Sequence, residues 1–175
     1  FGVFEVGMDQ KGEINNLTKI IKPDVGIITN VSYAHAKNFK NIKEIALAKS
    51  EIIDNIKKKG YLVLNADDKF YNLFRKIAYR KNIKVYSFSI KKKNATVKLD
   101  YIKKEKSKFK AYFSIGNQKK YFYISSNFEN YIKNLLAAIT VISIFKNVKN
   151  LSNNIFYNFK IPTGRGDISK IRIDK

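Results

Sequence analysis

The first half of the chain alternates short apolar runs with segments whose apolar residues recur every three or four positions. Short apolar runs are typical of buried strands, and the three- or four-residue spacing is typical of amphipathic helices. The strands predicted in this way are residues 1–7, 24–31, 61–65 and 84–90, and the helices are residues 12–22, 42–56 and 69–80. This alternation predicts an α/β fold with a largely parallel sheet flanked by helices.

The pattern changes near Lys91, beyond which apolar and polar side chains alternate. With Gly116-Asn117 as a turn, this stretch predicts an inserted antiparallel hairpin unit at about 91–126. A long apolar helix is expected from about Asn130 to Phe145, and after it a short amphipathic helix and a last strand that begins at ISKIRI. Because no repeat or low-complexity linker interrupts the pattern, we interpret residues 1–175 as one domain.

Composition and charge narrow the class of protein. The chain contains no cysteine, which excludes a disulfide framework and a thiolate metal site, and it contains no apolar run of membrane-spanning length. Its net charge of +21 invites a nucleic-acid partner. However, the lysines are spread along the chain among asparagines and isoleucines, as codon bias would produce, and most aromatics sit at positions where they would pack. We therefore expect no specific nucleic acid and no membrane insertion, with a basic nucleic-acid-binding domain or a non-catalytic remnant as alternatives.

Lys49 occupies an unusual position for a charged residue. It follows Ile45 and precedes Ile53 by four residues each, so it lies on the apolar stripe of its predicted helix. Burying an ammonium costs several kcal/mol unless it is paired or loses its charge. A buried lysine with a lowered pKa is more often a free amine, which can add CO₂ to form a carbamate, an anionic cation ligand. The alternative is an ion pair with Glu51 or Asp54, although neither shares its face closely.

Two further residues follow or end predicted strands. Glu5 lies near the carboxyl end of the strand at 1–7, and His35 follows the strand at 24–31. Because the carboxyl ends of parallel strands meet at one sheet edge, where ligands bind, both are expected there. Carboxylate oxygens are ligands that Mg²⁺ prefers. Taken singly, Glu5 is more simply an acid that reaches solvent and His35 a structural hydrogen-bonding group, but with a carbamylated Lys49 they predict a Mg²⁺ site.

Six segments of the chain occur in an order that resembles the central ATPase domain of the Mur ligase family. They are EVGMDQKGEI (5–14), PDVGIITNVSYAHAKNF (23–39), EIALAKSEI (44–52), LNADD (64–68), NLLAA (134–138) and GRGD (164–167). The resemblance covers most of the chain and is weakest across the predicted hairpin. It implies a P-loop-type fold that lacks its P-loop strand here, because the sequence contains no G-x-x-G-K-[ST].

The resemblance also implies roles for particular residues. Glu5, His35 and a carbamylated Lys49 match the family's Mg²⁺ ligands. Asn134 matches the asparagine that contacts the adenine of ATP, and Arg165 matches the arginine near the ATP phosphates. The residues at 128–131 depart from the family's Gly-x-His-Asn, which bears on the adenine pocket, and Asn30 and Asn65 are interpreted as supporting residues.

The family resemblance implies a cytoplasmic, ATP-dependent carbon–nitrogen ligase of peptidoglycan synthesis. The E-x-G-M and G-R-G segments look most like the branch that joins D-Ala-D-Ala to UDP-MurNAc-tripeptide through an acyl phosphate. A sibling Mur ligase or a folylpolyglutamate synthetase-like enzyme is the alternative. We expect the N-terminal UDP-sugar domain, the P-loop and the C-terminal domain to lie outside these residues, so that the monomeric fragment alone is inactive.

Overall fold

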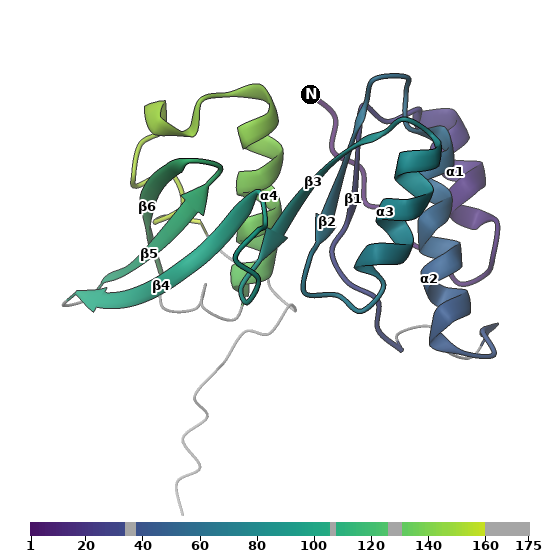
Figure 1. Ribbon diagram of the computed structural model, residues 1–175, viewed down its shortest axis with the longest axis horizontal. Helices are drawn as coiled ribbons and strands as arrows, with labels where there is room; N and C mark the ends of the chain where they lie inside the picture. Colours follow the sequence, from purple (N-terminus) through teal and green to yellow (C-terminus); the bar gives the residue numbers. More distant parts are fainter. Residues whose placement is uncertain (34–37, 106–107, 126–130, 160–175) are drawn as a thin grey trace, which may run out of the picture.

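The computed structural model describes residues 1–33, 38–105, 108–125 and 131–159. Within them a single six-stranded sheet runs through the molecule in the order β1-β2-β3-β4-β5-β6 (Figure 1). Neighbouring strands from β1 to β4 are parallel, whereas β5 runs antiparallel to both of its neighbours, β4 and β6. The predicted α/β fold, with a parallel part and an antiparallel unit, is confirmed.

From α1 onward the elements follow the predicted order along the chain. The strands are β1 (Val25–Ile28), β2 (Tyr61–Asn65), β3 (Lys84–Ser89), β4 (Val97–Glu105), β5 (Lys108–Ile115) and β6 (Gln118–Ile124). The α-helices are α1 (Glu13–Ile21), α2 (Ile42–Ser50), α3 (Tyr71–Arg80) and α4 (Ile132–Phe145). Two short 3-10 helices, η2 (Glu51–Asn55) and η4 (Val148–Asn150), follow α2 and α4.

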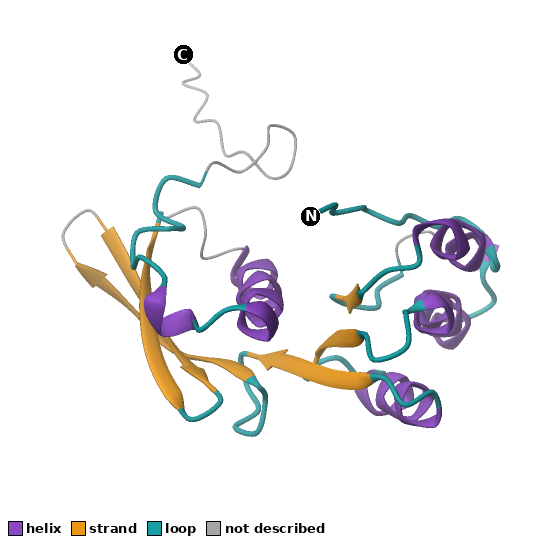
Figure 2. Ribbon diagram, turned by 90° about the horizontal axis from the view of Figure 1, so that it is seen from above, coloured by secondary structure: helices purple, strands orange, loops and turns teal. Residues whose placement is uncertain are grey.

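The strand β2 lies inside the parallel part and is buried on both faces, which explains its unbroken apolar run. Leu62 and Leu64 pack with Phe74 of α3 in one core cluster. Val63 points to the opposite face and joins the cluster built around α4. Helices α1, α2 and α3 therefore lie on one side of the sheet, and α4 lies on the other (Figure 2).

The helix α4 is apolar on most sides because it packs against both parts of the sheet. Its residues Leu135, Leu136 and Ile139 are almost fully buried. Their core cluster takes residues from β2, β3 and the antiparallel strands, including Val63, Phe88, Phe113 and Phe122. No helix in the described ranges is long and apolar enough to cross a membrane.

The turn between β5 and β6 lies where the sequence predicts it. Ile115 pairs with Gln118, so the connection is the two residues Gly116 and Asn117. Gly116 has a φ of 54°, which a residue without a Cβ adopts at little cost. The loop length and the glycine together fix the register of the two strands.

Three elements predicted near the chain ends differ from the structure or lie outside its described residues. The strand predicted at residues 1–7 is wrong, because this stretch forms no strand and Phe1, Val3 and Phe4 are exposed. Its apolar character resembles that of a buried strand, but a strand also needs a neighbour with which to pair. The short amphipathic helix after α4 is reduced to η4, and the strand predicted at ISKIRI lies outside the described residues.

Candidate active site

The carboxyl ends of β1, β2 and β3 meet at one edge of the sheet because the three strands are parallel. The loops at 29–31, 66–68 and 89–92 leave this edge, and α4 begins on the same side of the molecule (Figure 1). In open α/β sheets this edge is the usual place for ligands. The candidate site is built from side chains in these loops and in the helices beside them.

Asp68 connects the ends of β1 and β2. Its Oδ2 accepts the backbone N–H of Val31 at 2.8 Å, and its Oδ1 accepts that of Phe70 at 2.8 Å. The first bond fixes the start of the segment that leads from β1 toward His35. The second helps to turn the chain into α3. Asp68 is therefore placed at the edge by its own loop and holds the neighbouring loop in position.

Asp67 makes the corresponding connection to β3. Its Oδ1 accepts the Ser89 hydroxyl at 2.6 Å, and its Oδ2 accepts the Ile90 N–H at 2.7 Å. Burial alone would raise the pKa of Asp67, but these hydrogen bonds, that of Lys91 and the charge of Lys92 lower it from its ordinary value overall. The two adjacent aspartates thus hold three strand ends together. Sequence reasoning missed both, although the LNADD segment contains them.

Lys49 is half-buried on α2, as its place on the apolar stripe implies. Ile45 and Ala48 beside it are buried in the cluster that α2 forms with Met8 and Ile14. Burial lowers the pKa of the Lys49 ammonium, and the negative charge of Asp68 acts in the opposite direction. The lysine amine therefore lies partly out of water, in the electrostatic field of a carboxylate at the sheet edge.

The two carboxylates considered as ion-pair partners for Lys49 are engaged elsewhere. Glu51 accepts the backbone N–H groups of Gly12, at 2.9 and 3.1 Å, and of Asn15 at 3.1 Å, at the beginning of α1. Asp54 forms an ion pair with Lys81 at 2.8 Å. An ion pair between Lys49 and either of these carboxylates therefore loses its support.

Glu5 is exposed in a segment without regular secondary structure and does not lie at the end of a strand. Val6 and Met8, just after it, pack against the cluster of α1 and α2, so the segment passes beside the helix that carries Lys49. Asn38 donates from its side chain to the Asp9 carbonyl at 2.9 Å, which joins this segment to the loop after β1. His35 belongs to that loop but lies outside the described residues.

The remaining predicted residues lie around the same edge or beyond the described residues. Asn134 is exposed in the first turn of α4, and Asn30 is exposed just after β1. Asn65 is buried at the end of β2, where its Oδ1 accepts the Asp67 N–H at 2.9 Å. It therefore supports the loop, and its side chain is not presented to a ligand. Arg165 lies outside the described residues.

The chemistry of the donor set suits a hard cation only if Lys49 is modified. A Lys49 carbamate and Glu5 would each supply oxygen ligands, which Mg²⁺ prefers. Among the described residues there is no group of three or more His, Cys, Asp or Glu side chains that could hold a metal ion. The unmodified side chains in those ranges therefore form no complete metal centre.

These features define a class of protein. The chain belongs to the Mur ligase family, because the model of the Mur ligase middle domain matches residues 1–142. The UDP-N-acetylmuramoyl-tripeptide–D-alanyl-D-alanine ligase of Rickettsia prowazekii is 31% identical over 175 residues, which are 98% of this chain and 38% of that protein. The chain thus spans well under half the length of this relative.

Solved structures agree with this assignment of the fold. The MurF ligase of Thermotoga maritima in complex with ADP matches 95% of this chain and 37% of its own, with a TM-score of 0.73 and 21% identity. MurF from Acinetobacter baumannii matches 82% of this chain and 31% of its own, with a TM-score of 0.71 and 24% identity. The mixed sheet and the antiparallel unit are therefore those of a Mur ligase central domain.

Proposed function

We propose that the chain is the ATPase part of a cytoplasmic ligase that joins D-alanyl-D-alanine to UDP-MurNAc-tripeptide in peptidoglycan synthesis. Family membership and similarity along 98% of the chain to a ligase of that name support the reaction class. The main observation that supports the site is the half-buried Lys49, whose ammonium interacts electrostatically with Asp68. Glu51 and Asp54 are bound instead by Gly12 and Lys81.

The proposed reaction has two steps. A carboxylate oxygen of UDP-MurNAc-tripeptide attacks the γ-phosphorus of ATP, the bond to the β-phosphate oxygen breaks, and an acyl phosphate and ADP result. The amine of D-alanyl-D-alanine then attacks the acyl carbon, an amide forms, phosphate leaves and the amine loses a proton. Because phosphoryl transfer depends on positioning and charge neutralisation, the protein's contribution is to hold these groups in line.

We assign Glu5, His35 and Lys49 to the binding of Mg²⁺, which when bound neutralises charge on the phosphoryl oxygens. Burial lowers the pKa of the Lys49 ammonium, which favours the free amine; that amine adds to the carbon of CO₂, loses a proton and becomes an anionic carbamate. Asp67 and Asp68 hold the loops around this position. The negative charge of Asp68, which acts on Lys49, would repel a carbamate there, and a bound cation would offset that repulsion.

We assign Asn134 to the adenine of ATP and Arg165 to its phosphates, where a guanidinium offsets developing charge. Asn134 is exposed in the first turn of α4, on the side where the strands end, which supports this role. The sequence contains no G-x-x-G-K-[ST], and we therefore expect these 175 residues, acting as a monomer, to show no turnover by themselves.

The test measures phosphate release by the intact protein. Turnover should require ATP, UDP-MurNAc-tripeptide and D-alanyl-D-alanine together, and removal of any one should abolish it. Single amino acids with shorter UDP-MurNAc acceptors test for a sibling ligase. A folate substrate with glutamate tests for the folylpolyglutamate synthetase alternative, since the L. casei FPGS shares the fold with a TM-score of 0.61. Turnover only with one of these other pairs would overturn the proposed substrates.

A further inference from the structure

The outer face of the antiparallel unit carries a row of tyrosines that the active site does not use. Tyr101 pairs with Tyr112 across β4 and β5, and Tyr112 pairs with Tyr121 across β5 and β6. Because side chains alternate along strands and register partners share a face, all three point away from the core. The core side is occupied by Ala111 and Phe122, which are fully buried. These tyrosines depart from the expectation that most aromatics pack inside.

Tyr101 and Tyr112 form a stack that is open at the Tyr101 end, and the Tyr121 ring is tilted against Tyr112 by 44°. The Tyr101 and Tyr112 rings are stacked, with centroids 4.4 Å apart and an angle of 20° between their planes. The Tyr112 and Tyr121 centroids are 5.8 Å apart. Tyr101 is 55% exposed, and in the described ranges β4 pairs with β3 only at Val97 and Lys98. The ring face of Tyr101 that points away from Tyr112 therefore lies at a free sheet edge.

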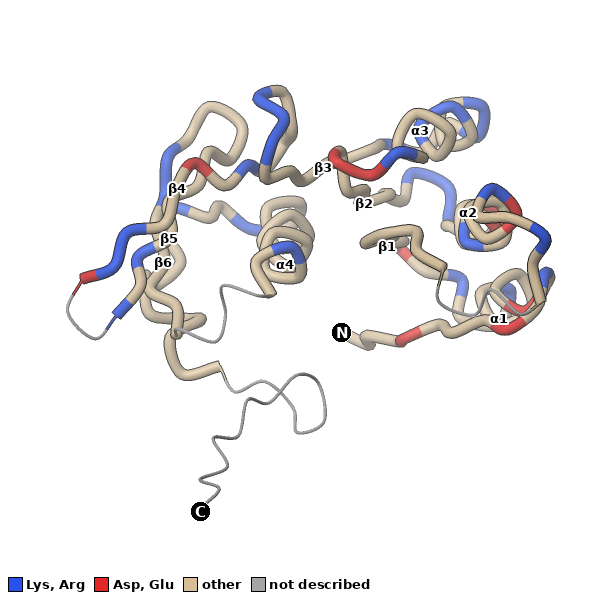
Figure 3. The backbone as a smooth tube through the Cα atoms, turned by 90° about the horizontal axis from the view of Figure 1, so that it is seen from below, with Lys and Arg blue, Asp and Glu red and all other residues tan. Residues whose placement is uncertain are grey.

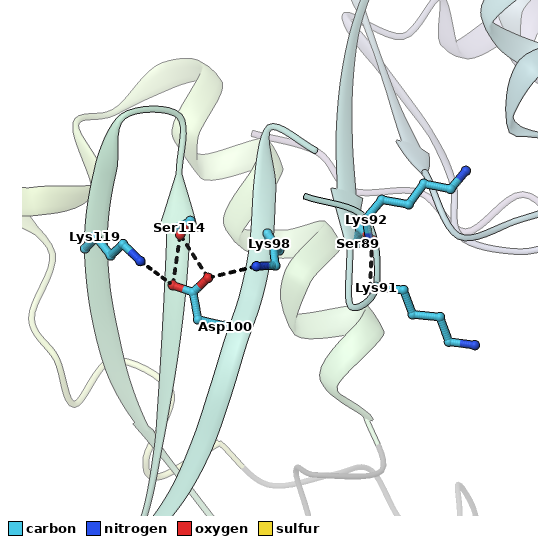
Figure 4. A network of polar contacts seen from close by, with 7 residues as sticks. All are labelled: Ser89, Lys91, Lys92, Lys98, Asp100, Ser114 and Lys119. Atoms are coloured by element: carbon cyan, nitrogen blue, oxygen red, sulfur yellow. Dashed lines mark hydrogen bonds and ion pairs between the residues drawn. The ribbon is translucent and has the colours of Figure 1, made fainter. Parts of the chain in front are cut away.

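Lysines flank the tyrosine row on both sides. On one side Lys103 pairs in register with Lys110, whose Nζ lies 4.1 Å from the centroid of the Tyr121 ring. On the other side lie Lys98 and Lys119, and Figure 4 shows both directed at Asp100. Ser114 also donates to Asp100, so this acid is already satisfied.

The charge balance of the face favours an anionic partner. The described parts of β4, β5 and β6 contain seven lysines and two acidic residues, Asp100 and Glu105. Asp100 forms ion pairs with Lys98 and Lys119, and Oε1 of Glu105 lies 3.9 Å from Nζ of Lys110. Lysines elsewhere are spread over both halves of the molecule (Figure 3). The antiparallel unit differs because its cations stand beside an open aromatic stack.

We propose that the outer face of β4, β5 and β6 binds single-stranded nucleic acid without sequence preference, with a base stacked on Tyr101 and phosphates held by Lys103 and Lys110. An acidic protein would use the lysines but has no need of a flat ring at the end of a stack. Every base has a flat π-face that can stack on a ring. The phosphates of a nucleic-acid strand lie at regular intervals along its backbone, where lysines can contact them. This interaction is independent of the ligase reaction, and because it has no sequence preference it goes beyond the expectation of no specific nucleic acid.

The test is fluorescence anisotropy of a labelled 12-nucleotide oligothymidylate with the intact protein at physiological salt. Tyr101→Ala should weaken binding about tenfold, because loss of one base–aromatic stack has an effect of this order. Tyr101→Phe keeps the ring and should bind like the wild type, whereas Tyr101→Leu should not. The matched control is Tyr79→Ala, which removes a tyrosine that is 83% exposed on α3 and should leave binding unchanged.

A second arm tests the lysines. Replacing Lys103 and Lys110 by Ala should weaken binding and flatten its dependence on salt, since each phosphate contact adds to that slope. The double variant Lys57→Ala and Lys58→Ala removes the same amount of positive charge from another surface and should weaken binding less. Two results would overturn the proposal: equal binding by Tyr101→Ala and wild type, or equally good competition by a polyglutamate peptide. Circular dichroism checks that each variant is folded. If Tyr101→Ala is unfolded, the comparison of binding by Tyr101→Phe and Tyr101→Leu still tests the proposal.

Discussion

Asp68 Oδ2 accepts the backbone N–H of Val31 at 2.8 Å, although the two residues are 37 positions apart in the sequence. This single bond joins the loop after β1 to the loop after β2, and the same carboxylate also accepts the Phe70 N–H. The position of the segment that leads toward His35 therefore depends on a residue in another part of the chain. The site is held by side chains that need not touch a substrate.

Replacing Asp68 with Ala should lower the free energy of unfolding by about 1–3 kcal/mol, because two backbone N–H groups in a partly buried loop lose their acceptor. Urea denaturation of the wild type and the variant measures the difference. Asp54→Ala is the control, since it removes an exposed ion pair with Lys81 and should cost at most about 1 kcal/mol. An equal loss in the two variants would contradict the structural role of Asp68.

The stability contributed by Asp67 should depend on pH. Its pKa in the folded protein lies below its ordinary value, so the folded state favours the ionised carboxylate. That contribution is complete above the ordinary aspartate pKa of about 3.9 and is lost as pH falls through the lower folded-state pKa. The stability difference between wild type and Asp67→Asn should therefore be largest near neutral pH and shrink below about pH 4.

Urea midpoints at several pH values measure this effect. Asp24→Asn is a suitable control because Asp24 lies on the surface, paired only with the exposed Lys57 at 2.9 Å in the described structure. A difference for Asp67→Asn that stays constant down to pH 2 would show that the carboxylate charge contributes nothing.

Lys49→Ala in the intact protein should lose most ligase activity, because it removes the amine from which the carbamate forms. Short carboxylic acids should restore part of the activity by occupying the vacated anionic position. Lys49→Arg should stay inactive, since a fixed cation repels Mg²⁺. Lys43→Ala, on the exposed side of the same helix, is the control and should retain activity. Near-normal turnover by Lys49→Arg would refute the carbamate and favour a structural lysine.

Gly60→Ala should destabilise the fold by about 1–3 kcal/mol, the usual cost of overpacking. A Cβ at Gly60 would lie 2.5 Å from Ile56 Cγ2 and 2.7 Å from the Asp24 carbonyl oxygen, and backbone cannot move aside easily. Gly7→Ala is the control, because a Cβ there meets no atom within 4 Å. Thermal or urea unfolding of the two variants gives the comparison, and similar stabilities would show that the turn before β2 is able to relax.

Most of the fold could be predicted from the sequence because burial leaves a periodic trace. The unbroken apolar run of β2 and the alternation around Gly116 each correspond to an environment that the structure contains. The stretch at 1–7 shows the limit of this reasoning. Apolar character predicts that a segment avoids water, but strand formation also depends on a partner backbone, which one segment's sequence does not reveal.

The candidate site was less predictable for a related reason. Lys49 could be found because its charge conflicts with its apolar stripe, and the structure places it half-buried. Asp67 and Asp68 produce no such conflict, since two acids after a strand look like an ordinary loop. Their role depends on bonds to Val31, Ser89 and Ile90, which are distant in sequence. The roles of His35 and Arg165 stay predictions, as does the convergence of Glu5 and His35 with Lys49.

The tyrosine row gives the protein an optical property by which the antiparallel strands can be followed separately from the helices. The chain has 11 tyrosines and no tryptophan, so its near-ultraviolet circular dichroism and intrinsic fluorescence come mainly from tyrosine. The stacked pair Tyr101 and Tyr112, 4.4 Å apart, is close enough for its electronic transitions to couple. The coupled transitions of this pair should report the antiparallel strands, while the far-ultraviolet amide signal reports all the helices, including α4 beside those strands. Coincident melting curves at the two wavelengths would mean that both parts unfold as one cooperative unit, and separate curves would reveal a partly folded species.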